Sequence, residues 1–282
     1  MKALLALLLV ASVAHANNKV IYGEDNRQDV FEVTNQMQLT LARSTAAMIP
    51  SSSLQRTGDE VRVMGPTMES RGFCREERFS QQPTAANCSG FLVGDKYLVT
   101  AGHCITSMSD CTGYRWVFDY KVDYSTQSQV TVPANSVYAC KRIISRALEQ
   151  ASGDDYALIE LERSVNDRAP LAFRRQGQIS VGEEILVIGH PTGLPTKITD
   201  QARVRSARPK YFVTNLDTYG GNSGSAVFNA RTGVVEGILV RGENDYVYDS
   251  ARSCRASNIC PENGCRGEDV TFITNIKELA NL

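Results

Sequence analysis

The sequence carries little net charge, few histidines and, beyond its first 16 residues, no long apolar run. Lys and Arg number 30 against 31 Asp and Glu, so the formal charge is −1 and no basic stripe indicates nucleic-acid binding. No later run approaches the roughly 20 apolar residues that cross a bilayer, so we expect no membrane anchor. Internal repeats and low-complexity linkers are also missing. The 282 residues, 42% of them hydrophobic, suffice for a two-lobed globular domain, which we expect to be a monomer.

The first residues have the pattern of an export signal. Lys2 supplies a positive start, residues 3–13 are apolar, and Ala-His-Ala at 14–16 fits a small-x-small cleavage site. A transmembrane anchor is the alternative, but the run is short and polar residues follow it. We therefore predict a signal peptide over 1–16, a short propeptide over 17–19 and one domain over 20–282. The mature protein is expected to be secreted, into the periplasm or the medium.

Eight cysteines, an even number, agree with export and predict four disulfides. The paired Cys-x-x-Cys and His-bearing spacings of zinc sites do not occur, and we expect neither a metal nor a cofactor. The cysteines are Cys74, Cys88, Cys104, Cys111, Cys140, Cys254, Cys260 and Cys265.

Short apolar segments separated by turn residues dominate the chain and predict an all-β fold, a barrel or a sandwich. Residues 91–93 and 97–99 flank Gly-Asp-Lys and read as a hairpin. Apolar residues on one face of 273–280 predict a C-terminal helix. The polar, cysteine-rich stretch 241–269 predicts a surface loop. The other predicted strands are 114–120, 156–161, 184–188, 211–216, 226–228 and 234–240.

A serine among glycines, in Gly-Gly-Asn-Ser-Gly-Ser at 220–225, is a candidate nucleophile, although this stretch alone reads more readily as a turn between two strands. A serine hydroxyl needs a neighbouring base, and histidine suits neutral pH. Of the three histidines, His15 falls in the signal and His190 precedes a proline in a turn, where we expect it to be solvated. His103 is therefore the candidate base.

Two adjacent carboxylates could orient that histidine. Asp155 directly precedes the apolar strand 156–159, which would bury it. Asp154 follows a glycine and reads as a solvated turn residue. We therefore choose Asp155.

Three motifs in this order resemble those of the chymotrypsin/trypsin-like serine proteases: Thr-Ala-Gly-His-Cys at 100–104, Asp-Tyr-Ala-Leu at 155–158 and Gly-Asn-Ser-Gly-Ser at 221–225. The resemblance implies a chymotrypsin-like double six-stranded antiparallel β-barrel, with the triad His103, Asp155 and Ser223 in the cleft. It also implies an oxyanion hole formed by the N–H groups of Gly221 and Ser223.

The family resemblance also bears on one disulfide and on the branch of the family to which the chain is similar. It implies the pair Cys88–Cys104, which would brace the histidine loop. We predict Cys111–Cys140 from proximity along the chain, and the other four cysteines allow three pairings. Asn222 stands where the animal enzymes carry aspartate. In this respect the sequence is similar to the bacterial branch of the glutamyl endopeptidases.

The resemblance implies a serine endopeptidase that acts on polypeptides, and Asp217 bears on its specificity. Asp217 lies six residues before Ser223, where trypsin-like enzymes carry the carboxylate that selects Arg or Lys. Thr218 matches a threonine of the glutamyl branch, but Leu239 occupies the place of its histidine. We predict cleavage after Arg or Lys; a glutamyl-type pocket, or neutralisation of Asp217 by Arg241, are the alternatives.

An inactive protease-like binding module is the competing function. Val240 and Arg241 stand where the animal enzymes carry serine and tryptophan, at positions that support the buried aspartate and line the substrate site. An esterase is a weaker alternative, because a strand rather than a helix is expected after Ser223.

Overall fold

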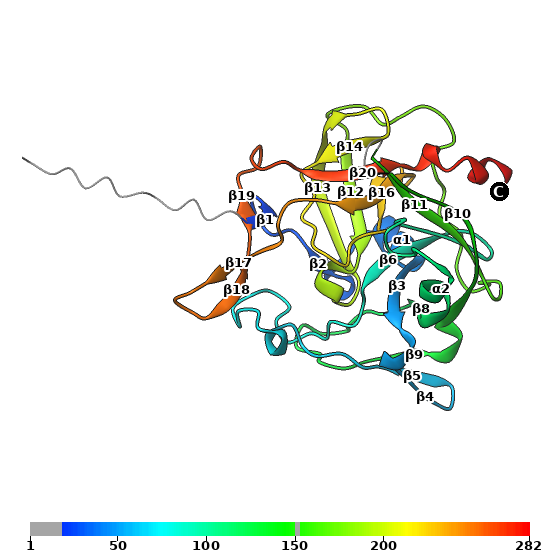
Figure 1. Ribbon diagram of the computed structural model, residues 1–282. Coiled ribbons are helices and arrows are strands. Elements are labelled where there is room, and N and C mark those ends of the chain that lie inside the picture. The colour runs from blue at the N-terminus through cyan, green and yellow to red at the C-terminus, as the bar shows by residue number, and fades with distance from the viewer. Residues whose placement is uncertain (1–18, 150–152) are drawn as a thin grey trace, which may run out of the picture.

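The computed structural model describes residues 19–149 and 153–282 (Figure 1). The predicted signal peptide, and the predicted propeptide apart from Lys19, lie outside these ranges. No helix of the described residues is long and apolar enough to cross a membrane.

The first half of the chain forms a closed six-stranded barrel in the order β10-β11-β7-β6-β3-β8. The predicted hairpin is present, since β6 and β7 pair antiparallel around residues 94–96. The strands are β3 (Thr45–Pro50), β6 (Cys88–Gly94), β7 (Tyr97–Thr100), β8 (Tyr114–Phe118), β10 (Val137–Glu149) and β11 (Asp154–Leu161).

The second half forms another barrel from β12, β15, β16, β20, β14 and β13, closed by the β12–β13 pairing, with β2 added beside β13. The predicted double-barrel fold is therefore confirmed. These strands are β2 (Gln28–Asp29), β12 (Glu184–Gly189), β13 (Lys197–Ala207), β14 (Tyr211–Thr214), β15 (Ala226–Asn229), β16 (Val235–Arg241) and β20 (Glu268–Phe272).

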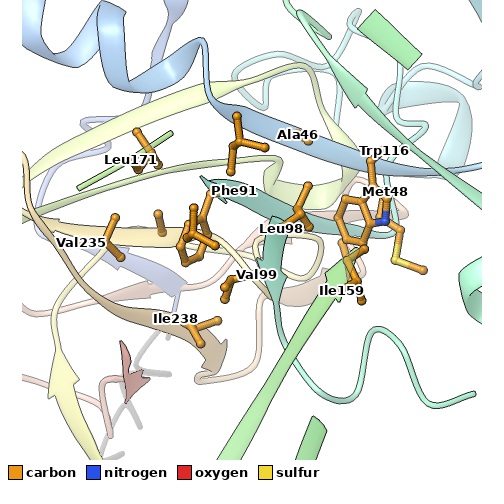
Figure 2. Packing of buried hydrophobic residues seen from close by; sticks show 14 of the residues in the cluster. Ala46, Met48, Phe91, Leu98, Val99, Trp116, Ile159, Leu171, Val235 and Ile238 are labelled. Atoms are coloured by element: carbon orange, nitrogen blue, oxygen red, sulfur yellow. The ribbon is translucent and has the colours of Figure 1, made fainter. Parts of the chain in front are cut away.

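One apolar core continues from the first barrel into the second. Phe91 and Trp116 are fully buried in the first barrel, and the same cluster includes Val235 and Ile238 of β16 (Figure 2). Because burial of such side chains contributes about 1.5–3 kcal/mol each, this shared core fixes how the two barrels meet.

The predicted C-terminal helix is not an α-helix but two 3₁₀ turns, Ile273–Asn275 and Lys277–Asn281. Ile273, Ile276 and Leu279 are all buried and are spaced by three residues. This spacing suits a 3₁₀ helix, which has three residues per turn. At Ile276 the backbone is extended (φ −82°, ψ 92°), which separates the turns. The α-helices of the described residues are α1 (Gln36–Ala42) and α2 (Met108–Gly113).

The cysteine-rich stretch contains more regular structure than predicted. It forms a hairpin of β17 and β18, and its β19 pairs with β1 near the start of the described chain. The remaining elements are β1 (Lys19–Tyr22), β4 (Leu54–Thr57), β5 (Glu60–Val63), β9 (Val130–Pro133), β17 (Tyr246–Asp249), β18 (Cys254–Ser257) and β19 (Ile259–Cys260), with 3₁₀ turns at Val30–Glu32, Ser51–Ser53, Glu69–Arg71, Ala134–Ser136 and Pro191–Gly193.

All eight cysteines form disulfides. The predicted pairs Cys88–Cys104 and Cys111–Cys140 are confirmed. Of the three pairings left open, the structure has Cys74–Cys254 together with Cys260–Cys265.

Candidate active site

His103 and Asp155 meet because their strands pair. His103 lies three residues after β7, Asp155 is the second residue of β11, and these strands are antiparallel neighbours. Nδ1 of His103 lies 2.8 Å from Oδ2 of Asp155, and the backbone N–H of His103 donates to Oδ1 at 3.0 Å. Because an ionised carboxylate only accepts, Nδ1 carries the proton and Nε2 is left as an acceptor. The Asp155 side chain is 4% exposed and that of His103 35%, so the carboxylate is buried while the ring remains accessible.

Asp154 points to other partners and is not the solvated turn residue that the sequence predicted. It is 8% exposed, it pairs with Lys210 at 3.0 Å, and it accepts a hydrogen bond from Asn275 at 2.7 Å. Neighbouring residues of a strand face opposite sides, so one carboxylate faces His103 and the other faces the second barrel.

The glycine-rich turn that carries Ser223 is held by β6 of the opposite barrel. The Ser89 N–H donates to the Ser223 carbonyl at 2.8 Å, and its hydroxyl donates to the Gly221 carbonyl at 2.8 Å. Gly221 has φ +97°, and a Cβ there would lie 2.5 Å from the His190 carbonyl oxygen. Glycine is therefore required at this position.

The N–H groups of Gly221 and Ser223 donate no hydrogen bond to any residue that the structure describes. They are free to bind an anionic oxygen, as the oxyanion hole of acyl-transfer enzymes does.

The Cys88–Cys104 disulfide lies between the histidine and the serine turn. Cys104 Sγ is 3.7 Å from the Ser223 carbonyl oxygen, and a ring nitrogen of His103 lies within 4.8 Å of both sulfurs. Since these sulfurs are bonded to each other, the grouping of two cysteines and a histidine is not a metal site.

A small cavity of about 100 Å³ opens beside Ser223 and has two acidic residues in its wall. Glu268, 3% exposed, accepts a hydrogen bond from the Thr218 hydroxyl at 2.6 Å, and burial raises its pKa to about 7. Asp245 accepts the Gly220 N–H at 2.6 Å, and burial raises its pKa as well. The lining residues are Thr218, Tyr219, Gly220, Ser223, Leu239, Val240, Arg241, Gly242, Asp245 and Glu268.

Comparison with known proteins identifies the family. Residues 88–238 match the trypsin-like peptidase domain. The chain belongs to the chymotrypsin/trypsin-like serine proteases. The glutamyl endopeptidase of Bacillus licheniformis is 25% identical over 193 residues, 62% of this chain, and the match spans 57% of that relative's length. A solved Glu endopeptidase in complex with MPD superposes with a TM-score of 0.56 at 15% identity, over 93% of this chain and 97% of the other, which shows the shared fold.

Asp217 of this trypsin-like peptidase does not lie at the base of the pocket, contrary to the sequence prediction. It is 1% exposed, and its two oxygens accept the backbone N–H groups of Tyr22 at 2.7 Å and Asn26 at 3.2 Å. It is not among the pocket-lining residues, whereas the next residue, Thr218, is. Asp217 thus fastens the N-terminal segment, and burial raises its pKa to about 7.

Arg241 does not neutralise Asp217 either. Its Nε donates to Asp269 at 2.9 Å, and its guanidinium also contacts the Gly153 carbonyl at 3.3 Å. The acidic group that sequence reasoning missed is Glu268. It lies in the polar, cysteine-rich part of the chain, 50 residues from Thr218, and carries no motif.

His190 is buried rather than solvated. It is 0% exposed, and its Nδ1 lies 3.1 Å from the Leu194 carbonyl oxygen. The centroid of its ring lies 5.7 Å from that of the Tyr120 ring. Burial lowers its pKa to about 3, so it remains neutral in the folded peptidase. Of the two histidines that the structure describes, His103 is thus the accessible one.

Proposed function

We propose that this trypsin-like peptidase is a secreted serine endopeptidase that acts through an acyl-enzyme, with Ser223 as nucleophile, His103 as base and Asp155 as its orienting carboxylate. The observation that carries the proposal is the doubly hydrogen-bonded His103–Asp155 pair beside a serine turn with two free N–H groups. An inactive binding module would not require this combination.

Each group has a defined chemical role in the proposed reaction. The Ser223 hydroxyl attacks the peptide carbonyl and passes its proton to Nε2 of His103, while the N–H groups of Gly221 and Ser223 stabilise the oxyanion. The C–N bond then breaks as His103 returns the proton to the leaving amine. Water, activated by the same histidine, hydrolyses the ester on Ser223. Asp155 stabilises the imidazolium throughout.

We further propose that the enzyme cleaves after Lys or Arg, with Glu268 and Asp245 as the acidic groups of the primary pocket. The one cationic residue in the pocket wall, Arg241, is paired with Asp269. A glutamate side chain would therefore meet buried acidic groups without a free cation, whereas an ammonium or guanidinium would compensate them. A glutamyl specificity, as named for the Bacillus relative, is the alternative.

Secretion is supported by the export-signal pattern at 1–16 and by the four disulfides, which persist in oxidising compartments.

Labelling with a fluorophosphonate probe, combined with peptides that differ only before the cleaved bond, tests this function. We expect Ser223 to be labelled and Lys or Arg peptides to be cleaved faster than Phe or Glu peptides. Asp155→Asn should lower kcat by about four orders of magnitude, because the histidine tautomer is lost. Asp154→Asn is the matched control and should retain kcat. Absence of labelling would favour the binding module, and preference for Glu would overturn the proposed specificity.

A further inference from the structure

A second, larger groove of about 460 Å³ adjoins the primary pocket at the Gly220–Gly221 turn. The two share Gly220 and Asp245, and the groove continues to Ala86 and Asn87, directly before Cys88. Its lining residues are Arg71, Phe73, Thr84, Ala86, Asn87, Thr192, Gly220, Gly221, Asp245, Tyr246 and Arg255.

Two arginines give this groove its chemistry. Arg71 and Arg255 both lie over the Phe73 ring, 5.7 Å and 4.0 Å from its centroid. Arg71 donates to the Thr192 carbonyl at 3.1 Å, and Arg255 donates to the carbonyl of Arg71. Neither forms a salt bridge within the part of the chain that the structure describes, so both guanidinium groups keep N–H donors for a ligand.

Asp245 is the acidic residue in the groove wall, and it leaves the positive charge in excess. Its Oδ2 accepts the Gly220 N–H at 2.6 Å, and the lining sets this one carboxylate against two guanidinium groups, those of Arg71 and Arg255. The groove therefore favours an anion at its arginine end.

The arginines are held on a rigid frame. The Cys74–Cys254 disulfide joins the residues adjacent to Phe73 and Arg255. The Cys74 N–H donates to the Arg255 carbonyl at 3.0 Å, and the Arg255 N–H donates to the Gly72 carbonyl at 3.0 Å. Because the two loops are cross-linked, little conformational freedom is lost when a ligand binds.

The position of the groove indicates which part of a substrate it receives. If the side chain before the cleaved bond fills the cavity beside Ser223, the residues after the bond leave on the opposite side of the Gly220–Gly221 turn. The groove reaches Asn87, which directly precedes Cys88, and the Cys88–Cys104 disulfide lies within 4.8 Å of a ring nitrogen of His103, the group that protonates the leaving amine in the proposed reaction.

We propose that this groove binds the leaving segment of the substrate, and that Arg71 and Arg255 select an Asp or Glu side chain shortly after the cleaved bond. Arginine pairs with carboxylate through two parallel hydrogen bonds, which gives geometric as well as charge selectivity. The inference rests on the proposed endopeptidase function, since it requires a polypeptide in the cleft.

The test uses the mature protein carrying Ser223→Ala, which binds peptides without cleaving them. Peptides with Lys before the scissile bond carry Glu or Gln at each position just after it, and fluorescence anisotropy gives their Kd. We expect one position at which Glu binds about tenfold more tightly than Gln, a difference that shrinks in roughly 0.5 M salt. In the same Ser223→Ala protein, the double change Arg71→Gln with Arg255→Gln should abolish the preference for Glu over Gln. Placing Lys instead of Gln at position 255 (Arg255→Lys) should partly restore that preference.

Arg252→Gln is the matched control, because Arg252 lies on the same hairpin but pairs with Asp249 and Glu76 outside the groove. It should retain the Glu preference. Circular dichroism and thermal unfolding check that each variant folds; if the double variant does not, the exposed Arg71→Gln alone should lower the preference. Equal binding of Glu and Gln peptides at every position, or a preference that survives loss of both arginines, would overturn the inference. A clear Glu preference in a wild-type protein that cleaves nothing would instead count against the proposed enzyme activity.

Discussion

Replacing Glu268 by Gln should stabilise the fold at alkaline pH while it damages cleavage after Lys. The Glu268 carboxyl is buried, and its pKa is raised from 4.5 to about 7. Between these values the unfolded chain has lost the proton that the folded chain retains, so stability falls as pH rises from 4.5 to 7. Since one pKa unit corresponds to about 1.4 kcal/mol, the cost above pH 7 approaches about 3 kcal/mol.

Gln has nearly the same shape and an oxygen that still accepts the Thr218 hydroxyl, but it does not ionise. A hydrogen bond to a neutral acceptor is weaker by about 1 kcal/mol, which leaves a net gain of about 2 kcal/mol at pH 8. Urea unfolding at pH 5 and pH 8 measures this gain. We expect the gain in the free energy of unfolding to be present at pH 8. At pH 5, where Glu268 of the folded wild-type protein is protonated, the gain should be much smaller.

The same variant should cleave Lys and Arg peptides about 10- to 100-fold less efficiently, because the pocket loses an ionised partner for the cation. Cleavage of a Phe peptide should change little. For the wild-type enzyme, kcat/KM for Lys peptides should rise as pH passes about 7 and Glu268 ionises.

Asp217→Asn is the matched control, because Asp217 is equally buried and its pKa is also raised to about 7. It should alter the pH dependence of stability between 3.8 and 7 but leave the Lys-to-Phe ratio unchanged, since Asp217 is outside the pocket. Loss of Lys preference in Asp217→Asn, with Glu268→Gln unaffected, would refute the assignment of the pocket carboxylate.

Three further outcomes follow from the geometry. Replacing Cys88 and Cys104 together by serine should lower the free energy of unfolding by about 2–5 kcal/mol in urea titrations; an unchanged midpoint would contradict this. Gly221→Ala should reduce kcat by about 10²–10³ in peptide assays with little change in KM, because its Cβ would displace the oxyanion donor; wild-type turnover would argue against that donor. His190 stays neutral when folded but takes up a proton below pH 6.5 when unfolded, so its contribution to stability is lost as pH falls from 6.5 towards 3. His190→Gln should flatten this part of the pH–stability curve in acid titrations, and an unaltered slope would show another group to be responsible.

The sequence alone determined the features that depend on local spacing. Alternating apolar runs around short turns predicted the strands, because side-chain period and turn chemistry are local properties. The motifs around His103 and Asp155 predicted a pair that the structure joins by a hydrogen bond, and Sγ of the residue after His103, Cys104, lies 3.7 Å from the Ser223 carbonyl oxygen. The choice of Asp155 over Asp154 followed from its place directly before an apolar strand, which predicted a buried side chain, although Asp154 proved to be buried as well.

Only the tertiary structure decided the features that depend on contacts between distant segments. Whether a carboxylate faces the pocket is set by packing: Asp217 and Thr218 are neighbours in the chain, yet one binds the N-terminal segment and the other faces Glu268. A spacing of six residues from Ser223 carries no information about that orientation. His190 was misjudged for the same reason, because a turn that reads as exposed packs against Tyr120, which follows β8 in the first half of the chain. The grouping of Arg71 with Arg255 needs a disulfide spanning 180 residues, which no local pattern encodes.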